Sequence, residues 1–193
     1  IRDRGMVNSI QQTLESCLIC RSHAGPNPKF KHDIPSPNLP FHVVSIDMIG
    51  PLPTAIGGHQ YILIAVDHLT KWVEASSAAS ATSKNVATFL LKFLFARHGS
   101  PRVLLSDNGL NFTSQIVTKL SNLFGTCPTF AAPYHPATNG AVERANGTLV
   151  SILRKLAAAD PLHWPRYLDA ALLAYRISYH RVIGLSPFKA LYG

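Results

Sequence analysis

The sequence predicts an α/β fold in which helices flank a five-stranded mixed sheet. Two observations lead to this prediction. Two β-rich segments separated by a short polar turn indicate an antiparallel hairpin, and the segments that follow alternate between strand and helix patterns. The chain has 193 residues, of which 47% are apolar, enough for the core of one domain. Many α/β folds share this order of elements.

The first three predicted strands lie close together in the sequence. The first is the short apolar run Val43–Met48. Gln60–Asp67 and Thr70–Ala75 form the predicted hairpin, because both segments are rich in β-branched and aromatic residues.

Helices and strands alternate after the hairpin. Ser83 is expected to cap a helix whose apolar residues recur at helical spacing, and Gly99-Ser-Pro101 is expected to end it. Arg102–Ser106 predicts a strand that stops at the turn signal Asp107-Asn-Gly109. The later expected elements are a helix over Thr113–Phe124, a strand over Thr129–Ala132, a long helix from about Asn139 to Ala159 and a final helix over Trp164–Tyr179.

Composition separates two segments upstream of this domain. Residues 1–22 are expected to form a short helical stretch that ends in Cys17-Leu-Ile-Cys20. Residues 23–40 contain five prolines and are expected to be an extended linker. The predicted domain therefore covers residues 41–193. Because the sequence opens at Ile1 and not at Met, we expect it to be a fragment of a longer protein.

Charge and composition exclude several classes of protein. Lys and Arg total 18 against 10 Asp and Glu, and a formal charge of +8 favours a polyanionic partner. No apolar run approaches the roughly 18 residues that a membrane span needs. Three cysteines do not make a disulfide scaffold, which indicates a reducing compartment, so the sequons at Asn111 and Asn146 are expected to be accidental.

Ten carboxylates are few enough to judge one by one. Seven have ordinary interpretations as solvated or turn-forming acids, and these include Asp67 and Glu74, which flank the hairpin. Asp47 differs because it interrupts an apolar strand, where an unpaired charge is costly. Asp107 ends another apolar strand, and sites usually form at the carboxyl ends of strands in α/β sheets. Glu143 lies in the first turns of the long helix.

Glu143 is predicted to lie on the polar side of that helix. An apolar stripe runs from Val142 to Leu156, and Glu143 lies more than about 100° from the middle of this stripe. It shares its face with Gly147 and Arg154. Gly147 either lets a bulky ligand approach the carboxylate or is simply a tolerated surface glycine.

Three carboxylates from two strands and a helix suit divalent-metal chemistry. Hard cations such as Mg²⁺ prefer oxygen ligands and keep positions open for water and phosphate. Two such ions about 3.5–4 Å apart stabilise the attacking and leaving oxygens of an in-line phosphoryl transfer. Spacing alone leaves open the alternative that the three acids are unrelated.

Three segments resemble the catalytic core of retroviral-type integrases. These segments are Ser45–Pro51, Leu105–Gly109 with Phe112, and Tyr134–Arg144. The 35 residues between Asp107 and Glu143 match that family's spacing of its second and third carboxylates. Val66–Ala75 and Gly184–Gly193 are more similar to the gypsy class of LTR-retrotransposon integrases than to the viral proteins. The resemblance covers about residues 41–193.

The resemblance implies DNA integration by a metal-dependent polynucleotidyl transferase with an RNase H-like fold. Asp47, Asp107 and Glu143 would be the catalytic residues and would bind two Mg²⁺ or Mn²⁺ ions. The reactions would be trimming of the element's DNA 3′ ends and their joining to target DNA. The implied partners are double-stranded DNA and further copies of the chain, in the nucleus and with no membrane. The alternative is a domesticated or inactive integrase-derived module that binds nucleic acid or protein.

The resemblance also implies DNA contacts. Retroviral relatives often carry Lys one and two turns after the glutamate, where this sequence has Gly147 and Val150, and Arg154 is a candidate to replace one of them. The expected nucleic-acid-binding residues are Tyr134, Asn139, Arg144, Arg154 and Lys155.

The N-terminal segment resembles half of the family's zinc module. Cys17 and Cys20 have the Cys-x₂-Cys spacing of a zinc half-site. The family places two His before the two Cys, and no His precedes Cys17 here. We therefore expect Zn²⁺ to bind only if a His pair upstream of this sequence is restored.

Overall fold

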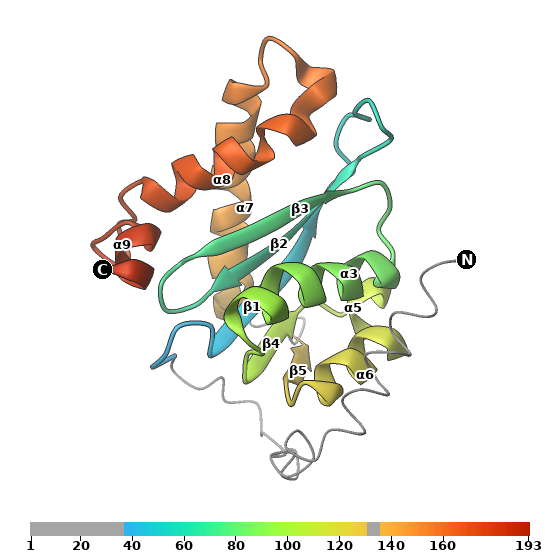
Figure 1. Cartoon of the computed structure of the whole chain (residues 1–193), viewed down its shortest axis with the longest axis vertical. Helices are drawn as coiled ribbons and strands as arrows, with labels where there is room; N and C mark the ends of the chain where they lie inside the picture. The colour runs from blue at the N-terminus through green and yellow to red at the C-terminus, as the bar shows by residue number, and fades with distance from the viewer. Residues whose placement is uncertain (1–36, 131–135) are drawn as a thin grey trace.

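The structure, a computed structural model, describes residues 37–130 and 136–193. Its centre is a five-stranded mixed sheet with the strand order β3-β2-β1-β4-β5 (Figure 1). The first three strands pair antiparallel, and the last two extend the sheet in parallel from β1. This arrangement confirms the predicted fold class. The strands are β1 (Val43–Ile49), β2 (Tyr61–Asp67), β3 (Val73–Ala78), β4 (Val103–Ser106) and β5 (Cys127–Phe130).

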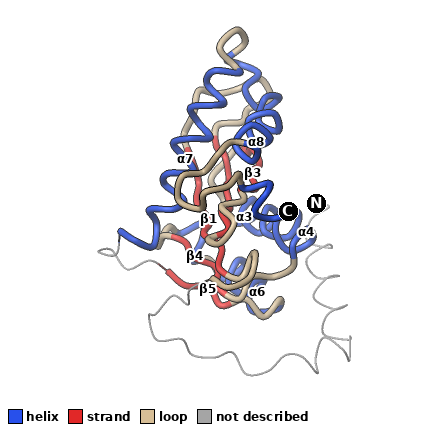
Figure 2. Tube along the Cα trace, turned by 90° about the vertical axis from the view of Figure 1, so that its left-hand side faces the viewer, coloured by secondary structure: helices blue, strands red, loops and turns tan. Residues whose placement is uncertain are grey.

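Helices cover both faces of the sheet, as Figures 1 and 2 show. The first face is covered by α3 (Ser83–Phe89), the π-helical segment η1 (Leu90–Phe95), α4 (Ala96–His98), α5 (Leu110–Thr113) and α6 (Gln115–Leu123). The opposite face is covered by α7 (Pro136–Leu156), the 3₁₀-helix η2 (Pro161–Tyr167) and α8 (Leu168–Ile177). A short helix, α9 (Pro187–Tyr192), follows.

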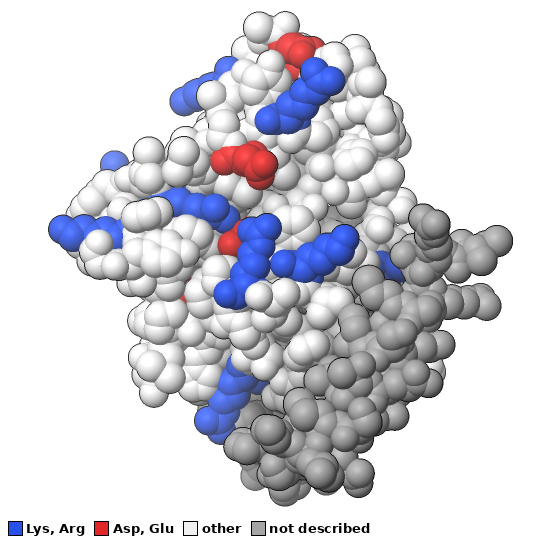
Figure 3. All heavy atoms as spheres, in the orientation of Figure 1, with Lys and Arg blue, Asp and Glu red and all other residues white. Residues whose placement is uncertain are grey.

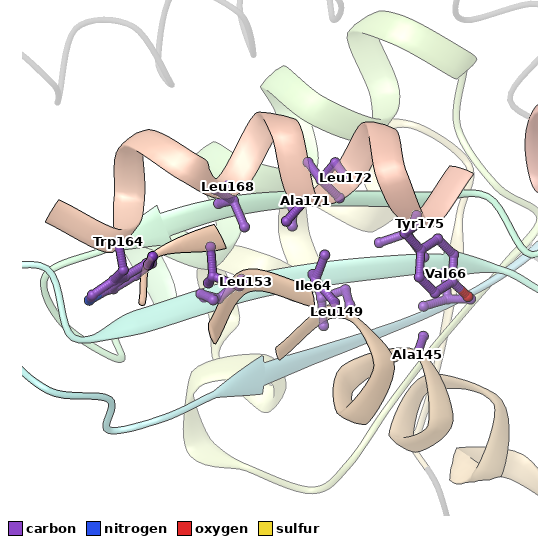
Figure 4. Close-up of a cluster of buried hydrophobic side chains, with 14 of the residues drawn as sticks. Ile64, Val66, Ala145, Leu149, Leu153, Trp164, Leu168, Ala171, Leu172 and Tyr175 are labelled. Atoms are coloured by element: carbon purple, nitrogen blue, oxygen red, sulfur yellow. The ribbon is translucent and has the colours of Figure 1, made fainter. Parts of the chain in front are cut away.

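Alternation along β2 supplies side chains to both faces. Ile62, Ile64 and Val66 pack against α7 and α8, while Leu63 and Ala65 belong to the core on the other face. Figure 4 shows the core between the sheet and the helices α7, η2 and α8. The helix residues shown there are Ala145, Leu149, Leu153, Trp164, Leu168, Ala171, Leu172 and Tyr175. The apolar stripe predicted for the long helix thus faces the sheet, and this packing fixes which side of α7 remains free.

Local structure differs from the predictions at element ends. Thr82 is the N-cap of α3 and accepts a hydrogen bond from the Asn85 N–H at 3.3 Å, so Ser83 is the first helical residue and not the cap. The third strand begins at Val73 because Thr70 and Trp72 take part in the turn after Asp67. The final helix predicted over Trp164–Tyr179 is divided between η2 and α8.

Two predicted segments cannot be compared with the structure. The N-terminal segment and most of the linker, with Cys17 and Cys20, lie outside the described residues, as does Tyr134. Among the described residues, no helix combines the length and the apolar character that crossing a membrane requires.

Candidate functional site

Asp47 lies on β1 with both carboxylate oxygens hydrogen-bonded. Oδ1 accepts a bond from the Met48 N–H at 2.7 Å, and Oδ2 accepts one from Asn146 Nδ2 on α7, also at 2.7 Å. Asp47 is half-buried. Its side chain is therefore held by hydrogen bonds from its own strand and from the helix that packs over that strand.

Asp107 directly follows β4, the parallel neighbour of β1. The last recorded pair joins Ser45 to Leu105, and the same register carried two residues further places Asp47 level with Asp107. Asp107 is exposed, and its Oδ1 accepts a bond from the Gly109 N–H at 2.9 Å. A Cβ atom at Gly109 would lie 2.9 Å from that same oxygen, so glycine allows the backbone to approach the carboxylate.

Glu143 lies on the exposed side of α7, as the sequence predicted. Its neighbours Val142 and Ala145 are both buried against the sheet, and they orient the helix so that Glu143 stays accessible. Gly147, one turn further on, is also exposed, and a Cβ atom there would meet no described atom within 4 Å. Packing within the described protein therefore does not require a glycine at this position.

The charges of Asp107 and Glu143 act on Asp47. Burial raises the pKa of Asp47 above its usual 3.8, and the negative charges of Asp107 and Glu143 raise it further. The hydrogen bonds from Met48 and Asn146 lower this pKa but do not cancel the rise. Within residues 37–130 and 136–193, no three His, Cys, Asp or Glu side chains are gathered closely enough to hold a metal ion as they stand. Asp47 is thus a half-buried acid that is repelled by other acids and has no basic group among its recorded hydrogen-bond partners.

An imidazole and a lysine lie next to the strand that carries Asp47. Ser45, two residues before Asp47, is buried, and its Oγ is 2.6 Å from His68 Nε2. Burial lowers the pKa of His68 to about 4, so its ring is neutral at pH 7. Lys71 Nζ donates to the His68 carbonyl at 2.7 Å, and burial lowers the pKa of this lysine, with the charge of Arg144 adding to the effect.

The predicted DNA-contacting residues remain predictions. Arg144, Arg154 and Lys155 are exposed on α7. Arg154 also borders a mainly apolar hollow of about 310 Å³ that includes Trp164. Asn139 lies within α7, but its side chain is not among those described. On the face shown in Figure 3, Lys and Arg side chains are more frequent than Asp and Glu, in line with the basic composition.

One residue of the candidate site, Asn146, was not predicted from the sequence. Asn146 was noted only as part of an accidental sequon, yet it binds the Asp47 carboxylate. Its position three residues after Glu143 was the available signal, because side chains at that spacing lie on neighbouring parts of a helix surface. An Asn at that spacing is too common to be singled out without the strand that it contacts.

Two other acids that were expected to be solvated or turn-forming are buried, and for Glu74 that interpretation was wrong. Asp67 does form a turn, but it is 1% exposed, and it accepts bonds from the Phe41 N–H and from both the N–H and the Oγ1 of Thr70. Glu74 is 3% exposed and is surrounded by donors. These donors are Trp72 Nε1, Arg97 Nη1, His98 Nε2 and Arg176 Nη2, at 2.9–3.1 Å.

Comparison with protein families gives one match over half of the chain. Residues 37–136 match the model described as the integrase core domain. The Pol polyprotein of feline endogenous virus ECE1 is 34% identical over 186 residues, which cover 95% of this chain and 18% of the polyprotein. The Tf2-3 transposon polyprotein of Schizosaccharomyces pombe is 25% identical over 193 residues, which cover 98% of this chain and 14% of that protein. The chain thus spans less than a fifth of either polyprotein, and the comparisons do not single out the gypsy class.

Solved structures with the same fold support this match. The catalytic core domain of BIV integrase superposes with a TM-score of 0.65 at 27% identity, covering 78% of this chain and 93% of that one. The simian T-cell lymphotropic virus intasome, solved in complex with PP2A regulatory subunit B56 gamma, gives a TM-score of 0.73 at 23% identity and covers 96% of this chain and 66% of that one. The HTLV-2 integrase catalytic core domain in complex with magnesium gives a TM-score of 0.65 at 20% identity and covers 80% of this chain and 99% of that one. The last two, below 25% identity, are evidence of the fold alone.

Proposed function

The chain belongs to the integrase core domain family, and from this premise we propose that it carries out the phosphoryl-transfer steps of DNA integration. The observation that carries the proposal is that Asp47 is repelled by the charges of Asp107 and Glu143. Burial raises the pKa of Asp47, and these two charges raise it further. Asp107 directly follows β4, the parallel neighbour of the strand that carries Asp47, and Glu143 lies on the helix whose Asn146 contacts Asp47.

We infer that these three carboxylates hold two Mg²⁺ or Mn²⁺ ions. The donors are all oxygens, as hard cations require. Asp47 uses two of about four acceptor positions on its carboxylate, which leaves the others for a metal. Asn146 Oδ1 is buried and has no hydrogen-bond donor among the described residues, so the site also has an acceptor to spare. The HTLV-2 core, which shares this fold, was solved in complex with magnesium.

The proposed reactions need no covalent bond to the protein. In trimming, a water oxygen forms a bond to phosphorus near the 3′ end of the element's DNA, and the bond to the departing 3′ oxygen breaks. In joining, the new 3′-hydroxyl oxygen attacks a phosphorus of the target DNA, and a target 3′-hydroxyl leaves. When bound, the two cations would stabilise the entering and leaving oxygens.

The protein's own residues would hold and orient the reactants. The three carboxylates fix the position of the reacting phosphate through the ions they bind. Arg144 follows Glu143 on α7, and Arg154 and Lys155 lie about 16 Å further along the helix. Basic side chains at these positions would contact phosphates on either side of the reacting bond and would release counterions as DNA binds.

We also propose the biological setting that the family suggests. The substrates are double-stranded DNA ends of the element and target DNA, and the active assembly contains several copies of the chain in the nucleus. Similarity to a protein solved as an intasome supports the assembly. The Val66–Ala75 and Gly184–Gly193 segments support a parent element of the gypsy class, a finer assignment than the family match provides.

The test is strand transfer by the full-length parent protein on short duplexes that carry the element's ends. Activity is expected with Mg²⁺ or Mn²⁺ and not with EDTA. Asp107→Asn is expected to lower it by at least about 10³-fold, because metal ions supply several kcal/mol of transition-state stabilisation. Asp169→Asn, the same change at an exposed acid on α8, serves as the control and keeps full activity.

Two results would contradict the proposal. Unchanged activity in Asp107→Asn would show that the site assignment is wrong. DNA binding by the wild type without strand transfer in either metal would favour an inactive nucleic-acid-binding module.

A further inference from the structure

Asn146 connects α7 to β1 at the candidate site. Its Nδ2 donates to Asp47 Oδ2 at 2.7 Å, across 99 positions of sequence. It lies three residues after Glu143, slightly less than one helical turn. One helix therefore carries one of the three carboxylates and holds another in place.

The contact with Asp47 decides how the Asn146 amide is oriented. An ionised carboxylate can only accept hydrogen bonds, so the NH₂ group must face Asp47. The amide oxygen is then left buried, and no donor among the described residues reaches it. Buried polar atoms are nearly always paired. Five buried side-chain atoms of the described residues lack a partner, and this one belongs to a residue that contacts a carboxylate of the candidate site, where a bound ligand would supply the donor.

Asn146 is also the contact that ties Asp47 to the rest of the site. The other hydrogen bond to this carboxylate comes from Met48, the next residue of the same strand. That bond fixes the side chain relative to β1 but not relative to α7. The bond from Asn146 fixes the carboxylate relative to α7, and hence relative to Glu143.

We propose that Asn146 is a positioning residue of the metal site, holding the Asp47 carboxylate toward α7 and presenting Oδ1 as an acceptor to the hydrated cation. The inference rests on the proposed function. Residues that orient metal ligands typically change metal affinity by about 10- to 100-fold when they are replaced. A hydrogen bond that served only folding would stabilise the protein equally with and without metal.

The experiment measures Mn²⁺ binding to the full chain by isothermal titration calorimetry, without DNA. Asn146→Ala is expected to weaken Mn²⁺ binding by about 10- to 100-fold. Asn122→Ala, at an exposed asparagine of α6, makes the same chemical change away from the site and leaves affinity unchanged. Asn146→Ser keeps a short donor and is expected to give an intermediate affinity, and it replaces the alanine variant if that variant does not fold.

A second readout separates positioning from folding. The melting temperature of metal-free Asn146→Ala is expected to stay near that of Asn122→Ala, because the change removes a buried unpaired oxygen together with one hydrogen bond. Wild-type Mn²⁺ affinity in Asn146→Ala would overturn the proposal. So would a lowered metal-free melting temperature with no loss of affinity in the folded protein.

Asp107→Asn, measured in the same way, distinguishes this inference from the proposed function. If Asp107→Asn binds Mn²⁺ as the wild type does, the metal site itself is misassigned. If Asp107→Asn loses binding while Asn146→Ala keeps it, the metal site stands and the role of Asn146 is wrong.

Discussion

Asp47 and Glu74 are acids on two strands of one sheet, but their surroundings have opposite effects. Glu74 is buried among two arginines, a histidine and the Trp72 indole. Burial alone would raise its pKa, but the His98 and Trp72 hydrogen bonds and the arginine charges outweigh burial and lower the pKa below 4.5. Asp47 has no basic partner among its recorded hydrogen bonds, and other acids lie near it.

The comparison shows which kind of buried acid marks a functional site. A carboxylate whose pKa is lowered by its partners contributes to stability when it is ionised, and its acceptor positions are occupied by the protein itself. A carboxylate that is kept half-buried beside others costs stability, and a bound cation would recover that cost. Both acids lie on strands of the sheet. Their hydrogen-bond and charged partners, and not their burial, therefore distinguish the structural residue from the candidate catalytic one.

The largest expected effect is a loss of strand transfer when a predicted metal ligand is replaced. Glu143→Gln keeps the size of the side chain but removes the charge, and strand transfer by the full-length protein is expected to fall by at least about 10³-fold. The free energy of unfolding without metal is expected to stay within about 0.5 kcal/mol, because the residue is exposed. Strand-transfer assays and urea unfolding measure the two quantities. A large loss of stability would mean that Glu143 is structural.

Glu74→Ala is expected to show the reverse pattern. It would leave Arg97 and Arg176 facing each other without their shared acid, and Arg176 is largely buried. Removing one partner of a buried ion pair costs about 3–5 kcal/mol, and partial exposure of Arg97 places this variant near the lower value. Urea unfolding against Asp169→Ala, an exposed acid, measures the loss. A cost below about 1 kcal/mol would break the comparison.

Asp47→Asn is expected to stabilise the protein in the absence of metal. The change removes a charge that burial and the charges of Asp107 and Glu143 disfavour, and the new amide can donate to Asn146 Oδ1 once the Asn146 amide turns over. A gain of about 1 kcal/mol in unfolding free energy is typical of such a relieved site. The same variant should lose strand transfer. A net destabilisation would show that the Asp47 carboxylate stabilises the fold.

The smallest expected effect is the difference in acid response. The folded-state pKa of Glu74 is lowered, so its contribution to stability is present above pH 4.5 and is lost as pH falls through the folded value. The folded-state pKa of Asp47 is raised, so its ionisation costs stability as pH rises above 3.8. Carboxyl-detected NMR titration of the metal-free protein measures both. Both acids titrating at their ordinary values would remove the electrostatic basis of the comparison.

The sequence was sufficient to predict where Asp47 and Asp107 lie in the strands and which side of α7 Glu143 occupies, and their role as metal ligands stays a prediction. An acid inside an apolar strand, an acid at a strand end and a helical stripe are local patterns, and each was visible without the fold. The surroundings of Glu74 could not be predicted, because Arg97, His98 and Arg176 lie 23, 24 and 102 positions away. The choice of Thr82 over Ser83 as cap also depended on structure, since both residues are good caps.

The central claim is that Asp47, Asp107 and Glu143 share divalent metal. Anomalous diffraction from crystals of the protein soaked in Mn²⁺ tests it most directly, because the ion is located without reference to activity. Manganese bound between the three carboxylates, with Asn146 still hydrogen-bonded to Asp47, is the predicted result. Manganese bound elsewhere, or none near these side chains at concentrations that support strand transfer, would contradict the account.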